Sequence, residues 1–328
     1  MAINLKQKHR IQTSVNVDRP KDDTLTIEDF INYHTDFVRE KQLENLSLRT
    51  IEDHKILFRY LTRWIEQSHW SDTNQCVQKS IFLDYKEYML FEKNYAPCTV
   101  NLRLRPIKTY INWLLKQEHI KVNYNNFIKL VKVSDDRVHP LSRAEVKRLI
   151  NAIGDSTYAR YRDLIITLTI LDCGIRIFEL LQLTVHDVNF KESFILVRAS
   201  VSKTRTERVL PISRQTLAYL EQLRDIALEQ NQEHLFLASS GENVLNRNDV
   251  FHNFRRYKAE ANITKKCTPY VLRHTFATEM VKIGVDIFTL QRMMGHKNIT
   301  TTRQYVFLDN EDLISKHKSS GILNHFLG

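Results

Sequence analysis

The sequence predicts a mainly α protein with two helical domains, of which the second carries a small antiparallel β-sheet. The 328 residues include only 7 Gly and 6 Pro, and so few turn-forming residues argue against an all-β fold. A composition of 42% hydrophobic and 26% charged residues fits a packed core and excludes wholesale disorder. Apolar residues recur mostly with helical spacing, and only residues 194–213 alternate in the manner of a β-hairpin or small sheet.

In the N-terminal half, the sequence predicts a flexible basic tail over residues 1–22 and a helical domain over residues 23–131. Thr26 and Ser47 stand where N-caps are expected, ahead of amphipathic segments. The predicted helices cover residues 27–42, 48–67, 80–93 and 100–119, the last introduced by Pro97 and Thr99.

The fourth predicted helix carries a basic face formed by Arg103, Arg105 and Lys108. Such a face is usually a solvated surface. The formal net charge of +10, however, favours a polyanionic partner, with nucleic acid first. We therefore predict that these three side chains contact DNA phosphates.

Residues 132–140 are polar, end in Pro140 and predict a linker. The second domain, residues 141–328 with a C-terminal tail, begins with a capping box of Ser142 and Glu145. Gly174 is placed to end a buried helix. The four cysteines have no close spacing, and no segment reads as a membrane span or signal peptide, so we expect a cytoplasmic protein.

Four segments of the second half contain residues suited to chemistry on a phosphate. Each residue alone is better explained by a structural role, such as a helix-terminal cation, a solvated turn or a core aromatic. Their joint occurrence in this order is what indicates a site. The residues are Arg176 and Glu179 in the first segment, Lys203 in the second, Tyr270 and Arg273 in the third, and His296 and Tyr305 in the fourth.

A phosphodiester under attack gathers negative charge on its non-bridging oxygens. Two arginines can clamp these oxygens, and an imidazole can donate a further hydrogen bond. A tyrosine hydroxyl can form a covalent intermediate if neighbouring cations favour its ionisation, and a lysine can protonate the leaving oxygen. The sequence contains no phosphate-binding GxxxxGK[ST] loop and no obvious carboxylate cluster, so we expect neither a metal ion nor a cofactor.

The segments GIRIFEL, YVLRHTFAT and MMGHKNITTTRQY resemble those of the tyrosine recombinase (phage integrase) family, which includes Xer-type recombinases and integrases of mobile elements. The match covers residues 142–310 well, and the helical N-terminal half resembles the family's core-binding domain in outline. The resemblance implies the following roles: Arg176 and Arg273 are the catalytic arginines, Glu179 is a supporting carboxylate, Lys203 is the general acid, His296 contacts the scissile phosphate and Tyr305 is the nucleophile.

The sequence departs from the family pattern at two positions. Tyr270 stands where the family usually has His, and it can still donate one hydrogen bond, so we expect activity to survive. Phe178 stands where a small polar residue is common, which we interpret as local packing. Lys203 and Arg205 both lie near the predicted hairpin tip, so either could be the active cation, and Arg205 is also a candidate DNA contact.

The resemblance further implies a site-specific recombinase that breaks and rejoins double-stranded DNA through a 3′-phosphotyrosyl intermediate. The task would be integration or excision of a mobile element, or resolution of DNA multimers. A homotetramer on two DNA sites is expected. The apolar end of the tail, from Ile322 to Leu327, would dock either on a neighbouring subunit or on its own domain.

Three alternatives are weaker. A type IB topoisomerase shares the nucleophile chemistry, but the GH-x-TT spacing is more typical of recombinases. A DNA-binding regulator that had lost the chemistry would not require the complete residue set. Metal binding by Cys267, His274 and His296 matches no common zinc spacing.

Overall fold

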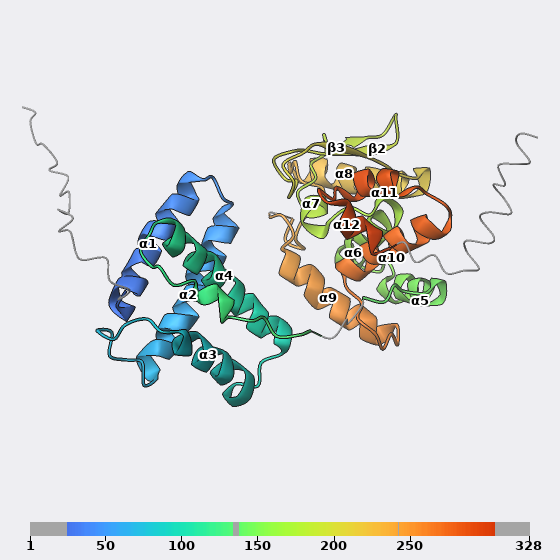
Figure 1. Ribbon diagram of the computed structural model, residues 1–328. Helices are drawn as coiled ribbons and strands as arrows, with labels where there is room; N and C mark the ends of the chain where they lie inside the picture. Colours follow the sequence, from blue (N-terminus) through green and yellow to red (C-terminus); the bar gives the residue numbers. More distant parts are fainter. Residues whose placement is uncertain (1–24, 134–137, 242, 306–328) are drawn as a thin grey trace, which may run out of the picture. The chain divides into compact units, whose positions relative to one another are not determined.

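The computed structural model describes residues 25–133, 138–241 and 243–305. The chain divides into two compact units, Met1–Asp136 and Arg137–Gly328, coloured from blue to green and from green to red in Figure 1. The predicted N-terminal tail, the centre of the predicted linker and the C-terminal tail lie outside the described residues. No helix within the described ranges is both long and apolar enough to cross a lipid bilayer.

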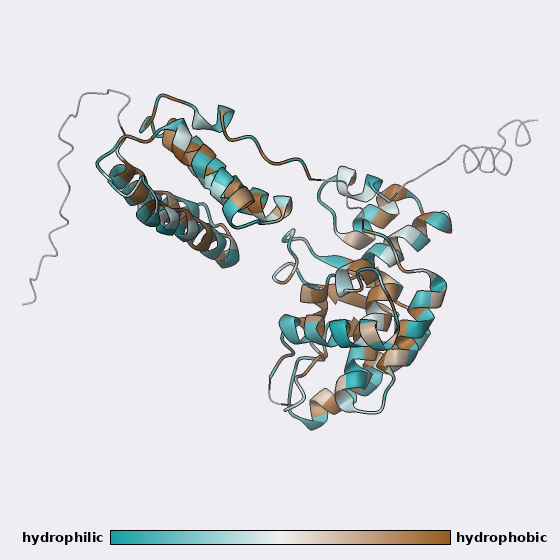
Figure 2. Cartoon of the chain, turned by 90° about the horizontal axis from the view of Figure 1, so that it is seen from below, coloured by the Kyte–Doolittle hydropathy of each residue, from teal (hydrophilic) through white to brown (hydrophobic). Residues whose placement is uncertain are grey.

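The first unit is built from four α-helices whose buried faces form one core. Thr26 and Ser47 cap α1 and α2 by accepting hydrogen bonds from the backbone at Asp29 and Thr50, as the sequence predicts. Along each helix hydrophilic and hydrophobic residues are mixed, which fits one buried and one exposed face (Figure 2). The elements are α1 (Ile27–Leu43), α2 (Leu48–Gln67), α3 (Lys79–Glu87), the π-helix η1 (Tyr88–Glu92), α4 (Pro97–Lys116) and the 3₁₀ turn η2 (Tyr124–Asn126).

The third predicted helix is interrupted where the sequence predicts continuity. The amide of Lys93 donates to the carbonyl of Tyr88, five residues back, so the helix after α3 widens into η1. The wider turn places Met89 in the core and leaves Phe91 exposed. A π-turn changes which residues face the core, and helical periodicity alone does not predict it.

The second unit surrounds the buried helix α6 (Tyr158–Cys173), which packs against α5 (Arg143–Ile153), α7 (Ile177–Leu181), α8 (Arg214–Glu229) and α10 (Pro269–Lys282) (Figure 1). The predicted capping box of Ser142 and Glu145 opens α5. Gly174 ends α6 in the left-handed conformation, as predicted. The remaining helices are α9 (Arg247–Glu260), α11 (Ile287–Met294) and α12 (Ile299–Arg303).

The antiparallel sheet of the second unit has the order β1 (Val188–Asn189), β2 (Phe194–Val197) and β3 (Arg208–Pro211). The predicted hairpin corresponds to β2 and β3, and β1 lies outside the predicted segment. In β3 the residues alternate between buried and exposed, so Arg208 shares the inner face with Leu210. Strand β3 packs on α11, and this contact brings Arg208 toward the end of that helix.

Candidate active site

Three arginines from three different elements hold the C-terminal end of α11. The last carbonyls of a helix have no intrahelical partner and carry partial negative charge, which makes them acceptors for cationic donors. Here three consecutive carbonyls each accept a hydrogen bond from a different guanidinium. The bonds run from Arg208 Nε to Met293 O at 3.1 Å, from Arg273 Nη2 to Met294 O at 2.5 Å, and from Arg176 Nη2 to Gly295 O at 2.8 Å.

Gly174 allows Arg273 to reach this place. At φ +64° the glycine ends α6, and its carbonyl accepts a hydrogen bond from Arg273 Nη1 at 2.5 Å. A Cβ atom at this position would lie 2.3 Å from the ring of Phe276, so the close approach of α10 to the end of α6 requires glycine. The second predicted arginine is therefore fixed at both ends of its guanidinium and is 5% exposed.

Glu179 lies between two of the three arginines and is 1% exposed. Its Oε1 accepts from Arg176 Nη1 at 3.0 Å, and Arg208 donates to both carboxylate oxygens, at 3.2 and 2.5 Å. Burial alone would raise the pKa of this carboxyl, but the hydrogen bonds and charges of Arg208 and Arg176 hold the pKa below its ordinary value. Glu179 is therefore an ionised carboxylate that orients both guanidinium groups.

His296 follows immediately after the held helix end. Its Nε2 lies 3.2 Å from Arg273 Nη2, and its Nδ1 lies 2.9 Å from the hydroxyl oxygen of Thr302. Burial, together with the charges of Arg273 and Arg176, lowers the pKa of His296 to about 4. The imidazole is therefore neutral at pH 7 in the protein without DNA.

Tyr305 packs against this imidazole. The two rings are nearly parallel, with 12° between their planes and 6.5 Å between their centroids. The centroid of the His274 ring lies 4.9 Å from that of Tyr305. Tyr305 is 4% exposed, and burial followed by the neighbouring Tyr270 raises the pKa of its phenol. The charges of Arg273 and Arg176 act in the opposite direction, toward the phenolate.

The structure therefore gathers Arg176, Glu179, Arg273, His296 and Tyr305 into one cluster within a single chain. The other predicted members lie at its edge or beyond it. Tyr270 is 53% exposed on the first turn of α10. Lys203 and Arg205 are exposed on the loop between β2 and β3, and no described hydrogen bond or ion pair joins Lys203 to the cluster.

The predicted DNA contacts on α4 have three different surroundings. Arg103 stacks between two rings, with its guanidinium carbon 4.2 Å from the centroid of Tyr60 and 4.5 Å from that of Tyr95. Arg105 is exposed. Lys108 donates to two backbone carbonyls at 2.8 Å each, in the turn that follows α4. Its ammonium is thus already engaged within the unit, which the basic pattern of the helix does not indicate.

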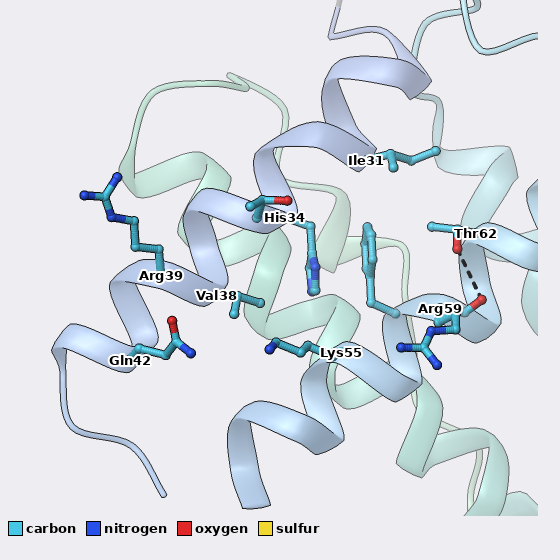
Figure 3. A pocket seen from close by; sticks show the side chains of 10 residues that line it. Ile31, His34, Val38, Arg39, Gln42, Lys55, Arg59 and Thr62 are labelled. Carbon is cyan, nitrogen blue, oxygen red and sulfur yellow. Dashed lines mark hydrogen bonds between the residues drawn. The ribbon is translucent and has the colours of Figure 1, made fainter. Parts of the chain in front are cut away.

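A basic pocket lies between α1 and α2 (Figure 3). Arg39, Lys55 and Arg59 line it, and its floor includes His34 stacked on Phe58 with the ring centroids 3.6 Å apart. None of the lining residues belongs to the cluster around His296, and no sequence pattern predicts this pocket.

Three further observations correct or extend the sequence interpretation. Phe178 is 55% exposed, so its interpretation as local packing is wrong. Arg208 and Thr302 belong to the cluster, but they are not among the residues predicted from the sequence. For Arg208 the alternating pattern of β3 could have indicated it, because this pattern places Arg208 on the same buried face as Leu210. Within the described residues, no three side chains of His, Cys, Asp or Glu are grouped to hold a metal ion.

Comparison with known proteins identifies the family. The model of the phage integrase family matches residues 115–312, which is more than half of the chain. The tyrosine recombinase XerA of Pyrococcus horikoshii is 27% identical over 296 residues, covering 89% of this chain and 95% of the relative. The tyrosine recombinase XerC 2 of Ralstonia nicotianae is 27% identical over 284 residues, covering 84% of this chain and 81% of the relative.

Solved structures share the fold. The integrase of the transposon Tn1549, solved in complex with transposon right end DNA, has a TM-score of 0.70 at 20% identity and covers 90% of this chain and 99% of its own. A lambda integrase dimer bound to a core site has a TM-score of 0.67 at 15% identity, covering 86% and 95%. The fold, the family match and the curated relatives agree, and the chain belongs to the phage integrase family of tyrosine-type site-specific DNA recombinases.

Proposed function

We propose that this recombinase breaks and rejoins double-stranded DNA through a covalent bond between Tyr305 and a backbone phosphate. One observation carries the assignment of residues: Arg176, Arg273 and His296 meet at the end of α11, and Tyr305 packs against His296. This arrangement supports a site in which two cations, an imidazole and a nucleophile would surround one phosphate.

The two arginines supply the phosphate clamp. Their Nη groups now donate to the carbonyls of Gly295 and Met294, so the donors already converge before DNA binds. The non-bridging oxygens of a scissile phosphate would take over these hydrogen bonds, with the greatest gain when negative charge develops in the transition state. Burial and the nearby Arg176 lower the pKa of Arg273 to about 9, and its guanidinium remains charged at neutral pH.

The reaction is two transesterifications. The phenol of Tyr305 releases its proton to solvent as its oxygen bonds to phosphorus, the bond from phosphorus to O5′ breaks, and Lys203 gives its proton to O5′. The 5′-hydroxyl of the partner strand then attacks the phosphotyrosine, its proton returns to Lys203, and the released Tyr305 takes up a proton from solvent. One phosphodiester is exchanged for another through a phosphotyrosyl ester, so no external energy source is required.

The remaining predicted residues would contact the scissile phosphate or the DNA backbone. Tyr270 would donate one hydrogen bond to the phosphate from the first turn of α10, in the place where the family usually has His. Arg103, Arg105 and Arg205 would contact the DNA backbone, and Lys108 would add the one ammonium donor that its two backbone hydrogen bonds leave. The DNA complexes of the Tn1549 and lambda integrases support double-stranded DNA as the partner. Residues 23–131 would be the core-binding domain and residues 141–328 the catalytic domain.

We further propose a homotetramer that acts on two DNA sites in the cytoplasm, for integration or excision of a mobile element or for resolution of multimers. The Tn1549 transposon integrase among the similar structures supports the first task.

The test begins with a DNA site, which the wild-type chain can select from a pool of random duplexes. A nicked suicide duplex carrying that site traps the covalent intermediate, because the short leaving strand diffuses away. Tyr305→Phe should form at least about 1,000-fold less adduct and bind the duplex as well as the wild type, since only the nucleophilic oxygen is lost. Tyr219→Phe, a half-buried tyrosine of α8 outside the cluster, is the matched control and should form adduct normally.

Two results would contradict the proposal. An adduct that persists in Tyr305→Phe would move the nucleophile to another residue. A wild-type chain that binds its selected site but forms no adduct would instead be a DNA-binding regulator.

A further inference from the structure

We propose that Arg208 is a positioning residue of this recombinase: it holds Glu179 and the end of α11 in place while Arg176 and Arg273 turn to the DNA phosphate. The inference rests on the proposed function of the cluster. It adds a residue to which neither the family resemblance nor the comparisons assign a role.

Arg208 differs from the other two arginines in that its Nε also makes a described hydrogen bond, and it differs from Arg176, though not from the equally buried Arg273, in exposure. Its Nε donates to the carbonyl of Met293, and both Nη groups donate to the carboxylate of Glu179. All three nitrogens therefore have a partner within the protein, and the side chain is only 6% exposed. A guanidinium so engaged has little left to offer a substrate oxygen, whereas the side chain of Arg176 is 22% exposed.

Phosphate binding changes what holds the end of α11. When Arg176 and Arg273 transfer their donors to the phosphate, the carbonyls of Gly295 and Met294 lose these partners. The bond from Arg208 to Met293 O need not break, because this arginine faces the protein interior from β3. Arg208 can therefore keep the turn before His296 at its position during the reaction.

The same side chain also sets the direction of Arg176. A carboxylate held by one partner can rotate, but a bidentate arginine fixes both of its oxygens in one plane. Glu179 held in this way presents Oε1 to Arg176 Nη1 at 3.0 Å. A lysine could supply one charge but could not span the carboxylate and Met293 O together. The geometry therefore requires arginine rather than a cation in general.

The experiment compares Arg208→Met, which keeps the apolar stem, with Arg208→Lys, which keeps the charge. Adduct formation on the selected suicide duplex is measured at saturating protein, and affinity is measured separately by fluorescence anisotropy. The matched control is Arg198→Met, because Arg198 pairs with the buried Asp187 at 2.9 Å and with the carbonyl of Gln182 but has no contact with the cluster. Thermal unfolding of each variant monitors the fold.

Arg208→Met should bind DNA within about threefold of the wild type and form adduct about 30- to 100-fold more slowly, because small misplacements of reacting groups are costly. Arg208→Lys should recover part of this loss, and Arg198→Met should form adduct within about threefold of the wild-type rate. If Arg208 acts through Glu179, adding Arg208→Met to Glu179→Gln should slow the reaction by no more than about twofold beyond Glu179→Gln alone.

Three results would overturn the inference: adduct formation by Arg208→Met within threefold of the wild type, losses that multiply in the double variant, or an equal loss in Arg198→Met. If Arg208→Met does not fold, Arg208→Lys decides, and a normal rate in that variant contradicts the proposed geometry. If the wild-type chain forms no Tyr305-dependent adduct, both the proposed function and this inference are wrong. If the Tyr305 adduct forms normally and the Arg208 variants form it at the wild-type rate, only the inference is wrong.

Discussion

Arg273 Nη2 lies 3.2 Å from His296 Nε2, and this contact assigns the proton on the imidazole. A guanidinium has no acceptor, so Nε2 must present its lone pair to Arg273. The ring proton is then on Nδ1, which donates to the hydroxyl oxygen of Thr302 at 2.9 Å. Because the pKa of His296 is lowered to about 4, this neutral tautomer dominates at pH 7. Donation from His296 to a phosphate requires that Arg273 move away and that Nε2 gain a proton.

Thr302→Val tests the importance of this orientation. Thr302 is fully buried, and valine has nearly its shape, so the change removes the acceptor for Nδ1 and leaves a buried donor unpaired. We expect normal DNA binding and about tenfold slower adduct formation, in keeping with the cost of about 1–3 kcal/mol for an unsatisfied buried group. Thr301→Val, at the exposed neighbouring position, is the control and should behave as the wild type. Equal rates for both variants would show that Thr302 does not orient the imidazole.

Lys203 and Arg205 can be distinguished by a substrate in which sulfur replaces the bridging O5′. A thiolate leaves without protonation, because the pKa of a thiol is near 8.5, far below that of an alcohol. Lys203→Ala should therefore form adduct at least about 100-fold more slowly on the normal duplex and recover on the sulfur-containing one. Arg205→Ala should change the rate of adduct formation to the same extent on both substrates. Recovery in Arg205→Ala only would assign the acid to Arg205.

The sequence predicts features that depend on residues close together in the chain, and it does not predict those that depend on residues far apart. The caps at Thr26, Ser47 and Ser142 are local patterns of a few residues, and the structure confirms all three. The mainly α fold with one small sheet is likewise confirmed. The two hydrogen bonds that Arg208 donates to Glu179, 29 residues away, depend on how β3 packs, which no local pattern encodes. The π-turn at Tyr88 and the two-residue strand β1 are too short to leave a periodic signal.

Gly174→Ala should destabilise the catalytic unit through two separate effects. A side chain at φ +64° costs about 1–2 kcal/mol, and its Cβ would overlap the ring of Phe276, which adds about 1–3 kcal/mol. In a Phe276→Ala background the overlap is absent, so Gly174→Ala should show the first cost alone. Chemical denaturation of Gly174→Ala in the two backgrounds measures the difference, and equal losses would mean that Phe276 moves aside freely.

The N-terminal unit should lose stability in acid because of His34. This ring is buried, stacks on Phe58 and meets Tyr110 edge-on, and burial followed by the charges of His54 and Lys55 lowers its pKa to about 3. The unfolded chain, with a histidine pKa near 6.5, then binds more protons than the folded chain between about pH 6.5 and 3. The stabilising contribution is present above pH 6.5 and is lost as the pH falls, by about 3 kcal/mol between pH 7 and 4.

His34→Phe removes the titrating group and keeps an aromatic ring against Phe58. At pH 7 the variant should therefore unfold at nearly the same denaturant concentration as the wild type. Between pH 7 and pH 4 its free energy of unfolding should fall less than that of the wild type. Tyrosine and tryptophan fluorescence follow the transition, and His69→Phe, at an exposed ring of the same unit, is the control. If His34→Phe lost stability toward pH 4 as steeply as the wild type, the acid sensitivity would have to come from other groups, and the buried ring of His34 would be a packing element without a role in the pH response.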